Sequence, residues 1–264
     1  MAHKENIVVQ NVVFSYGENE AIRGISATFD PGKFIGIVGP NGCGKSTFLD
    51  LLIGIKKASK GKVILDGHEI GNYSKKELAL RMALVPQKFF INFPFTVMEV
   101  LMMGRHPYIP RFSSPSASDY KIVEKVAHEF GLTDFLSRLV TELSGGEIQR
   151  VVVARAVVQD TPFLLLDEAT SNMDIKHTLD ILNGLKARVA KKGCTVISVM
   201  HDLNLAAMFC DEILILRDGM LHSQGEVSEI LTGETIREVF EVNAEVVKVG
   251  ANGNLRIFFN EVIR

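Results

Sequence analysis

The sequence predicts an α/β fold with a mostly parallel sheet and an inserted helical lobe. Short apolar runs, such as Phe163–Leu166 and Thr195–Val199, suit central strands that are covered on both faces. These runs alternate with segments of helical character, and alternating strands and helices indicate an α/β core. From about residue 89 to 160 the pattern is helical, so we expect this segment to form the inserted lobe.

Each element is placed by its apolar residues and by the glycines or capping residues at its ends. The dipeptide Asn252-Gly253 favours a tight turn, so Val246–Phe259 is expected to form a hairpin. Strands are also expected at 7–16, 21–29, 34–38, 62–66 and 213–216. Helices are expected at 45–54, from Ser118 to about 130, at 145–158, at 175–192 before Gly193, and at 226–241.

The composition is that of an ordinary globular protein, with 47% hydrophobic and 23% charged residues in a chain of 264. A net charge of −2 gives no argument for nucleic acid or an anionic membrane surface as partner. The three cysteines, Cys43, Cys194 and Cys210, are odd in number and scattered, which favours a reducing compartment. No run approaches 18 apolar residues, so any membrane association is expected to go through a partner.

The segment Gly39–Thr47, called the phosphate loop below, fits a pattern that binds nucleotide phosphates. Gly39 and Gly44 bracket four residues, Lys45 and Ser46 follow, and the segment lies between an apolar strand and a helix. Glycines let backbone N–H groups turn inward, and the helix directs its positive end at the same anion. Lys45 would supply charge to the β- and γ-phosphates, and Ser46 a hydroxyl to Mg²⁺. An accidental glycine-rich turn is the alternative interpretation.

Cys43 occupies a variable position of the phosphate loop, and the simplest interpretation is a small residue that fits there. Phosphoryl transfer to water needs positioning and charge rather than a thiol. The start of a helix lowers a thiol pKa, however, so Cys43 could be reactive. On that hypothesis, alkylation of the thiol slows hydrolysis and bound ATP protects against it.

Two carboxylates, Asp167 and Glu168, follow the apolar run Phe163–Leu166. In a parallel sheet the carboxyl end of such a strand faces the nucleotide crevice. Asp167 is placed to hold Mg²⁺, directly or through water. Glu168 suits the task of orienting and polarising an attacking water. An Asp-Glu pair is common at strand ends, so this assignment depends on the phosphate loop.

Two more polar residues follow short strands. His201 comes after a strand that we expect beside the Asp167 strand, and from there it would reach the γ-phosphate. Gln87 ends the short strand that contains Leu84 and would ligate Mg²⁺ or water as a neutral side chain. One histidine among seven is a weak signal, and a plain polar loop residue is an equally good interpretation of Gln87.

The segment Leu143–Glu147, with the sequence Leu-Ser-Gly-Gly-Glu, is called the signature segment below. Taken in order with the motifs above, it resembles the ATP-binding subunits of ABC transporters, and the match covers essentially the whole chain. The resemblance implies a RecA-like P-loop NTPase fold with an N-terminal antiparallel β subdomain. It divides residues 1–240 into a core (1–88 and 160–225) and a helical subdomain (89–159), and leaves 241–264 as a C-terminal extension.

The resemblance assigns a role to each motif residue and implies ATP and Mg²⁺ as cofactors. Tyr16 would stack on adenine, and Asp174 would end a loop, Ser171–Asp174, that contacts a second subunit. The implied catalytic residues are Glu168, His201 and Gln87, and the implied metal ligands are Ser46, Gln87 and Asp167. The implied ATP-binding residues are Tyr16, Gly39, Pro40, Asn41, Gly42, Cys43, Gly44, Lys45, Ser46, Thr47, Ser144, Gly145, Gly146, Glu147 and Asp174.

The resemblance also implies a mechanism. Ser144, Gly145 and Gly146 open a helix, which makes a second anion-binding terminus. In the resembling proteins this terminus meets the γ-phosphate of the opposite subunit, so a head-to-tail homodimer encloses two ATP molecules and opens after hydrolysis. The implied partners are a second copy, a polytopic membrane permease and, indirectly, a substrate-binding protein. The implied location is the cytoplasmic face of the membrane, and no nucleic acid is expected.

The segment Val97–Tyr108 narrows the resemblance to ATPases of the iron-siderophore, haem and vitamin B12 (cobalamin) importers, and Val239–Val242 resembles the same group. The expected function is therefore ATP hydrolysis that powers uptake of a metal chelate through the permease. A soluble ABC ATPase of an assembly or repair system, without a permease, is the alternative. A nucleotide kinase or small GTPase is a third class, against which the signature segment argues.

An aromatic and methionine cluster lies between residues 89 and 103. The phenylalanines, Phe89-Phe90 and Phe93-Pro-Phe95, are interpreted as a groove that receives a short helix of the permease. The pair Met102-Met103 is interpreted as core of the helical lobe. Each group could instead take the role of the other. A Phe93→Asp change is expected to uncouple transport and to spare basal hydrolysis.

Overall fold

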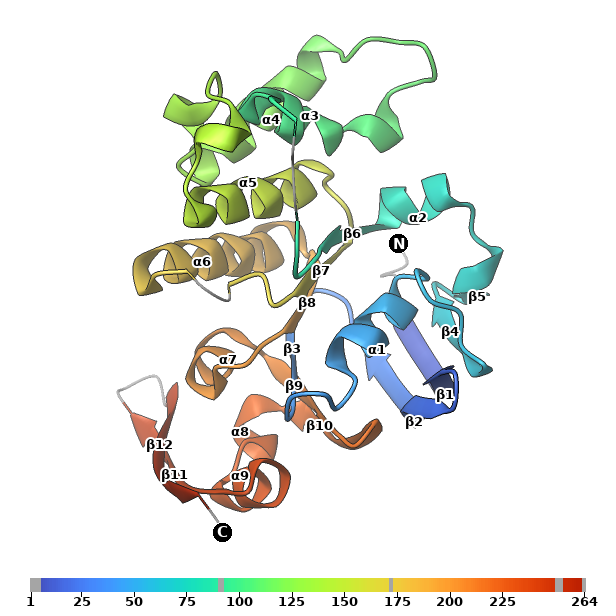
Figure 1. The fold of residues 1–264 in the computed structure, drawn as a ribbon, viewed down its shortest axis with the longest axis vertical. Helices are drawn as coiled ribbons and strands as arrows, with labels where there is room; N and C mark the ends of the chain where they lie inside the picture. Colours follow the sequence, from blue (N-terminus) through green and yellow to red (C-terminus); the bar gives the residue numbers. More distant parts are fainter. Residues whose placement is uncertain (1–5, 90–92, 171–172, 250–253, 263–264) are drawn as a thin grey trace. The chain divides into compact units, whose positions relative to one another are not determined.

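The computed structural model describes residues 6–89, 93–170, 173–249 and 254–262, and Figure 1 shows its ribbon. The chain divides into two compact units. Unit 1 combines Met1–Asn72 with Thr195–Arg264, and unit 2 is the continuous segment Tyr73–Cys194. Both units contain strands as well as helices, as the predicted α/β class requires. The helical lobe expected at 89–159 lies within unit 2.

The N-terminal part of unit 1 forms an antiparallel sheet, as predicted. Its strand order is β2-β1-β4-β5, and β1 pairs with both β2 and β4 in antiparallel register. Ile7 and Val9 of β1 are buried because alternate residues of a strand point to the same face. The elements are β1 (Ile7–Tyr16), β2 (Asn19–Phe29), β4 (Lys60–Leu65), β5 (His68–Glu69) and the 3₁₀ turn η1 (Ile70–Asn72).

A second set of strands in unit 1 carries the phosphate loop. β3 (Phe34–Val38) is parallel to β8 (Thr195–Val199) on one side and to β9 (Glu212–Arg217) on the other. Every residue of β3 and β8 is buried, which confirms the prediction that the apolar run at 195–199 is a central strand. β10 (Met220–Glu226), which sequence reasoning missed, pairs antiparallel with β9.

The C-terminal part of unit 1 corrects one prediction. The helix expected at 226–241 is two helices, because the chain turns at Leu231 and Thr232 starts a new helix by accepting the N–H of Thr235. A hairpin follows, as predicted, while its turn at Asn252-Gly253 lies outside the described residues. The elements are α7 (Leu203–Phe209), α8 (Val227–Ile230), α9 (Gly233–Phe240), β11 (Val242–Val249) and β12 (Asn254–Val262).

Unit 2 combines two parallel strands with a group of helices. β6 (Met82–Val85) is parallel to β7 (Phe163–Asp167), with Val85 paired to Leu166. The α-helices are α2 (Lys75–Arg81), α3 (Val97–Met103), α4 (Ala117–Glu129), α5 (Gly145–Val158) and α6 (Ile175–Lys192). The 3₁₀ turns are η2 (His106–Tyr108), η3 (Thr133–Phe135) and η4 (Val140–Glu142). Among the described residues of both units, no helix is long and apolar enough to cross a membrane.

The helix α5 lies at the centre of unit 2, where it contacts α3, α4, α6 and β6. Its bounds and those of α6 confirm the predictions. The start of α4 was predicted two residues too late, because Ser116 rather than Ser118 is the cap. The Ser116 hydroxyl accepts the N–H of Asp119, and the Asp119 carboxylate accepts the N–H of Ser116. This reciprocal capping box satisfies two N–H groups at the start of the helix.

Candidate nucleotide site

The phosphate loop joins β3 to α1 (Lys45–Leu52) by a path that only glycine allows at two positions. Gly39 adopts φ 151°, and a Cβ there would lie 2.1 Å from the carbonyl oxygen of Leu216. Gly44 adopts φ 100°, and a Cβ there would lie 2.7 Å from the carbonyl oxygen of Ala21. The loop is therefore shaped by close backbone approach, as the predicted phosphate cradle requires.

Lys45 holds its charge inside this loop although it is almost fully buried, at 5% exposure. Its ammonium group donates to the carbonyl oxygens of Gly39 and Pro40, at 2.8 Å each. A buried ammonium needs such partners because desolvation disfavours its charged form. Phosphate oxygens are stronger acceptors than carbonyls, so the same ammonium is positioned to bind a phosphate anion.

The environment of Cys43 contradicts the hypothesis of a reactive thiol. The side chain is 5% exposed, and this burial raises the pKa of Cys43 more than the neighbouring Lys45 charge lowers it. The Sγ atom also fills the space beside Gly39, 2.8 Å from where a Cβ would lie. Since a thiol reacts as its thiolate and needs access, the interpretation of a small residue that fits the loop is the better one.

Tyr16 lies next to the phosphate loop within unit 1. Its hydroxyl is 3.3 Å from the Thr47 hydroxyl, and its ring is half exposed at 52%. The Lys56 ammonium lies 5.5 Å from the ring centre and is bound by Asp50 at 2.8 Å. Phe14 packs edge-on against the same ring, with 4.9 Å between centroids. The ring is thus half exposed with defined neighbours, and its stacking on adenine stays a prediction.

His201 follows β8, and the phosphate loop follows β3. β3 and β8 are parallel neighbours, with Ile37 paired to Val199. The phosphate loop and His201, which follow these strands, therefore lie at the same edge of the sheet. The N–H of Met200 donates to the carbonyl of Ile37 at 3.0 Å, which fixes the chain just before His201. Asp202 then caps α7 by accepting the N–H groups of two following residues. The fold thus places His201 and the phosphate loop at the same edge of the sheet within unit 1.

Gln87 and Glu168 meet in unit 2. They follow β6 and β7, which are parallel and in register, so both side chains lie at the carboxyl ends of these strands. The Gln87 Nε2 donates to the Glu168 Oε2 at 2.7 Å. Asp167 precedes Glu168 at the end of β7 and is half-buried. The structure therefore joins two of the predicted catalytic residues by a direct hydrogen bond, which the sequence alone did not indicate.

The signature segment starts α5 with a complete capping box. The Ser144 hydroxyl accepts the N–H of Glu147, while the Glu147 carboxylate accepts the Ser144 N–H at 2.7 Å and the Ser144 hydroxyl at 2.6 Å. The hydrogen bond from the Ser144 hydroxyl lowers the pKa of Glu147 most, and the hydrogen bond from the Ser144 N–H lowers it further. Gly145 is exposed, and Gly146 is half-buried. Glu147 is thus engaged in the cap, and its predicted contact with nucleotide stays a prediction.

The remaining predicted residues have local roles. Asp174 caps α6: its carboxylate accepts the His177 N–H at 2.9 Å, and this bond is the main cause of the lowered pKa of Asp174. The loop residues Ser171 and Asn172 lie outside the described residues. Ser46 lies in the first turn of α1, as predicted, and is half-buried.

Sequence reasoning missed two contacts of α5. The Gln149 side chain donates to the carbonyl of Ala169, the residue after Glu168, at 2.9 Å. The Arg155 guanidinium lies over the ring of Phe89, 4.2 Å from its centre. The only available signal was that both residues belong to the helix that follows the signature segment.

Comparison with known proteins identifies the family. The ABC transporter model matches residues 22–171. This chain belongs to the ABC transporter family. The hemin import ATP-binding protein HmuV of Bradyrhizobium diazoefficiens is 39% identical over 238 residues, which cover 87% of this chain and 86% of HmuV. The iron(3+)-hydroxamate import ATP-binding protein FhuC of Bacillus subtilis is 34% identical and covers 92% of this chain and 90% of its own length.

Other ABC transporter relatives are longer than this chain. The cobalamin import ATP-binding protein BtuD of Halobacterium salinarum is 37% identical over 233 residues. These residues cover 88% of this chain and only 58% of BtuD. Among solved structures, a chain of a metal-chelate type ABC transporter in an inward-facing conformation has a TM-score of 0.84 and 27% identity over 98% of both chains. The dimeric cassette MJ0796, bound to ADP and phosphate, has a TM-score of 0.73 and 28% identity over 84% of this chain and 98% of its own.

Proposed function

We propose that this chain is the ATP-hydrolysing subunit of an ABC importer that takes up a metal chelate through a separate membrane permease. The observation that carries the proposal is the hydrogen bond that the Gln87 side chain donates to the Glu168 carboxylate. It links the expected catalytic carboxylate to the segment that leads toward the exposed Phe93 and Phe95. A partner that moves this segment would therefore affect the position of Glu168. The cargo class rests on the names of the haem, hydroxamate and cobalamin importer relatives.

ATP and Mg²⁺ are the cofactors that the proposal requires, and the residues fit both. The phosphate loop has no room for a Cβ at Gly39 and holds the Lys45 ammonium among its carbonyls. The Ser46 hydroxyl and the Asp167 carboxylate are the hard oxygen donors that Mg²⁺ prefers, and phosphate oxygens would complete its coordination. Glu168 would orient the attacking water, and a second copy would supply the signature segment to each nucleotide.

The permease would contact two features of unit 2. The first is the pair Phe93 and Phe95, which are 68% and 36% exposed, with ring centroids 6.1 Å apart. This exposure fits the groove interpretation of the phenylalanines, while Phe90 lies outside the described residues. Met103 is 41% exposed, so its interpretation as core is wrong. Exposed large apolar side chains in one region favour a protein contact.

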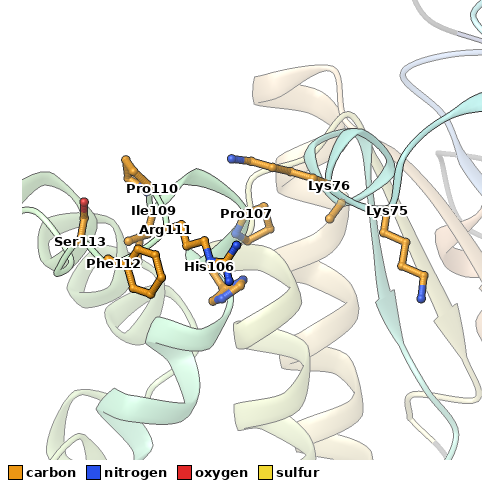
Figure 2. Close-up of a pocket in the computed structure, with 10 residues that line it drawn as sticks. Lys75, Lys76, His106, Pro107, Ile109, Pro110, Arg111, Phe112 and Ser113 are labelled. Atoms are coloured by element: carbon orange, nitrogen blue, oxygen red, sulfur yellow. The ribbon is translucent and has the colours of Figure 1, made fainter.

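The second feature is a pocket of about 710 Å³ between α2 and residues 106–113 (Figure 2). Its lining surface is mostly apolar, and Phe112, one of the lining residues, is 95% exposed. Lys75, Lys76 and Arg111 supply positive charge to the lining, and Lys76 extends toward this loop in Figure 2. An apolar pocket with a basic rim fits a short permease segment that combines apolar side chains with acidic ones.

The proposal is tested by reconstituting the chain with permease subunits in vesicles and comparing uptake of a cobalamin, a haem and a ferric siderophore. We expect ATP-dependent uptake of one of them. Phe93→Asp should abolish uptake and leave ATP hydrolysis by the isolated chain within about twofold, because the side chain is exposed. Phe258→Asp in unit 1, where Phe258 is 56% exposed, is the matched control and should preserve uptake.

The alternative outcomes are also informative. Hydrolysis without binding to any permease would favour a soluble ABC ATPase of an assembly or repair system. Loss of folding in Phe93→Asp, seen as a lost cooperative unfolding transition, would favour a core role for Phe93.

A further inference from the structure

The helix α5 has side-chain contacts with both catalytic segments of unit 2. Gln149 donates at 2.9 Å to the carbonyl of Ala169, which lies two residues after the end of β7. Arg155 lies over Phe89, two residues after Gln87. At the end of the same helix, Gln159 donates to the carbonyls of Ala79 and Met82, at 2.6 and 3.0 Å, where α2 leads into β6. One helix thus holds the start of β6 and the loops that follow β6 and β7.

The Gln149 contact bears on the geometry of Glu168. Glu168 adopts φ 52°, a left-handed conformation that is unfavourable for a residue with a long side chain. Such a conformation persists only where neighbouring contacts impose it. The Gln149 amide holds the carbonyl of the next residue, Ala169, which is 3% exposed, and Gln87 holds the Glu168 carboxylate itself. Backbone and side chain of Glu168 are therefore fixed by different contacts.

The Arg155 contact bears on Gln87 in the same way. Burial lowers the pKa of Arg155, and a desolvated guanidinium is attracted more strongly to an aromatic face than an exposed one. The backbone of α5 packs closely against Gly104, the residue that ends α3. A Cβ at Gly104 would lie 2.3 Å from the Arg155 carbonyl oxygen, so α5 has little freedom to shift here. Phe89 and the nearby Gln87 are thus tied to a closely packed part of α5.

We propose that Gln149 and Arg155 are positioning residues, through which α5 holds Glu168 and Gln87 in the geometry for hydrolysis. Because α5 begins at the signature segment, a displacement of Ser144 would reach the catalytic pair of the same chain through these two contacts. The inference rests on the proposed ATP hydrolysis. It predicts that nucleotide at the signature segment of one subunit adjusts the catalytic carboxylate of that subunit.

The test compares two glutamines of one helix in the otherwise intact chain. Gln149→Met keeps the length of the side chain and removes its N–H donor, and Gln159→Met makes the same change away from the catalytic pair. We expect Gln149→Met to lower kcat about tenfold, the factor for losing one good hydrogen bond, with KM changed less than twofold. Gln159→Met should lower the melting temperature and leave kcat within about twofold.

The Arg155 contact has its own conservative variant. Arg155→Lys keeps a cation over the Phe89 ring and should retain most of the activity, whereas Arg155→Met should lose about as much kcat as Gln149→Met. The cooperativity of hydrolysis with ATP concentration should also fall in Arg155→Met. A melting temperature that falls equally in both Arg155 variants, with equal kcat, would mean that the residue only supports folding.

Equal losses of kcat in Gln149→Met and Gln159→Met would overturn the proposal, because a general loss of packing would explain both. Amide hydrogen exchange of residues 167–170 in the same proteins gives a second readout that needs no hydrolysis. Exchange should be faster in Gln149→Met and unchanged in Gln159→Met, and the opposite pattern would also overturn the proposal. A wild-type chain that hydrolyses no ATP would refute the proposed function, and the exchange result would still decide the positioning role.

Discussion

The two helix N-termini that are expected to bind phosphate differ in how their own N–H groups are satisfied. α1 starts after Gly44, which has no side chain to cap it, and its described first turn, Lys45–Phe48, contains no acidic residue. α5 starts at Ser144, whose capping box brings the Glu147 carboxylate against the helix terminus. The first terminus presents a cation and backbone donors to an incoming anion, and the second already holds an anion of its own.

This difference indicates that the two termini contribute unequally to nucleotide binding. Helix N-termini attract anions because their N–H groups lack partners within the helix. At α1 the loop geometry and the Lys45 ammonium are fixed before nucleotide arrives. At α5 a phosphate would have to share the Ser144 hydroxyl and N–H with Glu147. We infer that the phosphate loop supplies most of the nucleotide affinity, while the signature segment adds a weaker contact.

The largest expected effect is at the phosphate loop, the terminus that is expected to bind nucleotide more tightly. Lys45→Ala removes the buried ammonium, and we expect nucleotide affinity to fall by about a hundredfold or more, since charge-assisted hydrogen bonds to phosphate are lost. Equilibrium binding of a fluorescent ATP analogue measures the change. Lys60→Ala on the exposed part of β4 is the control and should bind normally. Wild-type affinity in Lys45→Ala would break the comparison.

The next largest effect tests the weaker terminus. Ser144→Ala removes the cap of α5, and Ser116→Ala removes the equivalent capping-box serine of α4. Both should cost about 1 kcal/mol of stability in denaturant unfolding, the usual value for a lost cap. Only Ser144→Ala should also lower kcat/KM for ATP, by about tenfold. If both variants lowered kcat/KM equally, the effect on hydrolysis would come from stability alone.

A smaller effect isolates the charge of Glu147. Glu147→Gln preserves the capping box, because Gln also accepts the bond, and removes the negative charge from the terminus. The apparent KM for ATP should fall about threefold at low salt, since a charge at a helix terminus contributes up to about 1 kcal/mol. Glu99→Gln in the matching box of α3 should change nothing in KM. A higher KM in Glu147→Gln would instead indicate that Glu147 contributes to nucleotide binding, as the family resemblance implied.

Local chemistry explains why the sequence predicted some elements well. Gly193 adopts the left-handed conformation that ends α6, and Ser144 with Glu147 defines the start of α5, so these bounds followed from the residues at the helix ends. Signals of similar strength compete elsewhere. Ser116 and Ser118 both suit a cap, and only Ser116 has Asp119 three residues later. Thr232 interrupts a helical pattern that appears continuous from 226 to 241.

The candidate site was predicted as a set of residues, whose roles stay predictions, and its contacts could not be predicted. The phosphate loop, Gln87 and Glu168 were found because their order and spacing match a known pattern. The bond between Gln87 and Glu168 depends on the register of β6 against β7, which no local signal encodes. The contacts of Gln149 and Arg155 depend on where α5 packs against these strands, so the same limit hid both residues.

The smallest expected effect concerns pH. The bonds from Ser144 hold the pKa of Glu147 below its ordinary value, so the folded state binds a proton at Glu147 less readily than the unfolded state. A depressed folded pKa means that this stabilisation is fully present above the unfolded pKa, about 4.3 for a glutamate, and is lost as the pH falls through the lower folded pKa. Stability of the wild-type chain should therefore fall more steeply below about pH 4.3 than that of Glu147→Gln.

Denaturant unfolding at a series of pH values measures this difference, with Glu142→Gln as a control that removes a carboxylate from the adjacent turn η4. The control should retain the wild-type slope if the capping bonds cause the effect. Identical slopes in wild type and Glu147→Gln would mean that the carboxylate is not held at the helix terminus in solution. The N-terminus of α5 would then be as accessible to a phosphate as that of α1. The two termini would no longer differ in whether a carboxylate of the same chain occupies them.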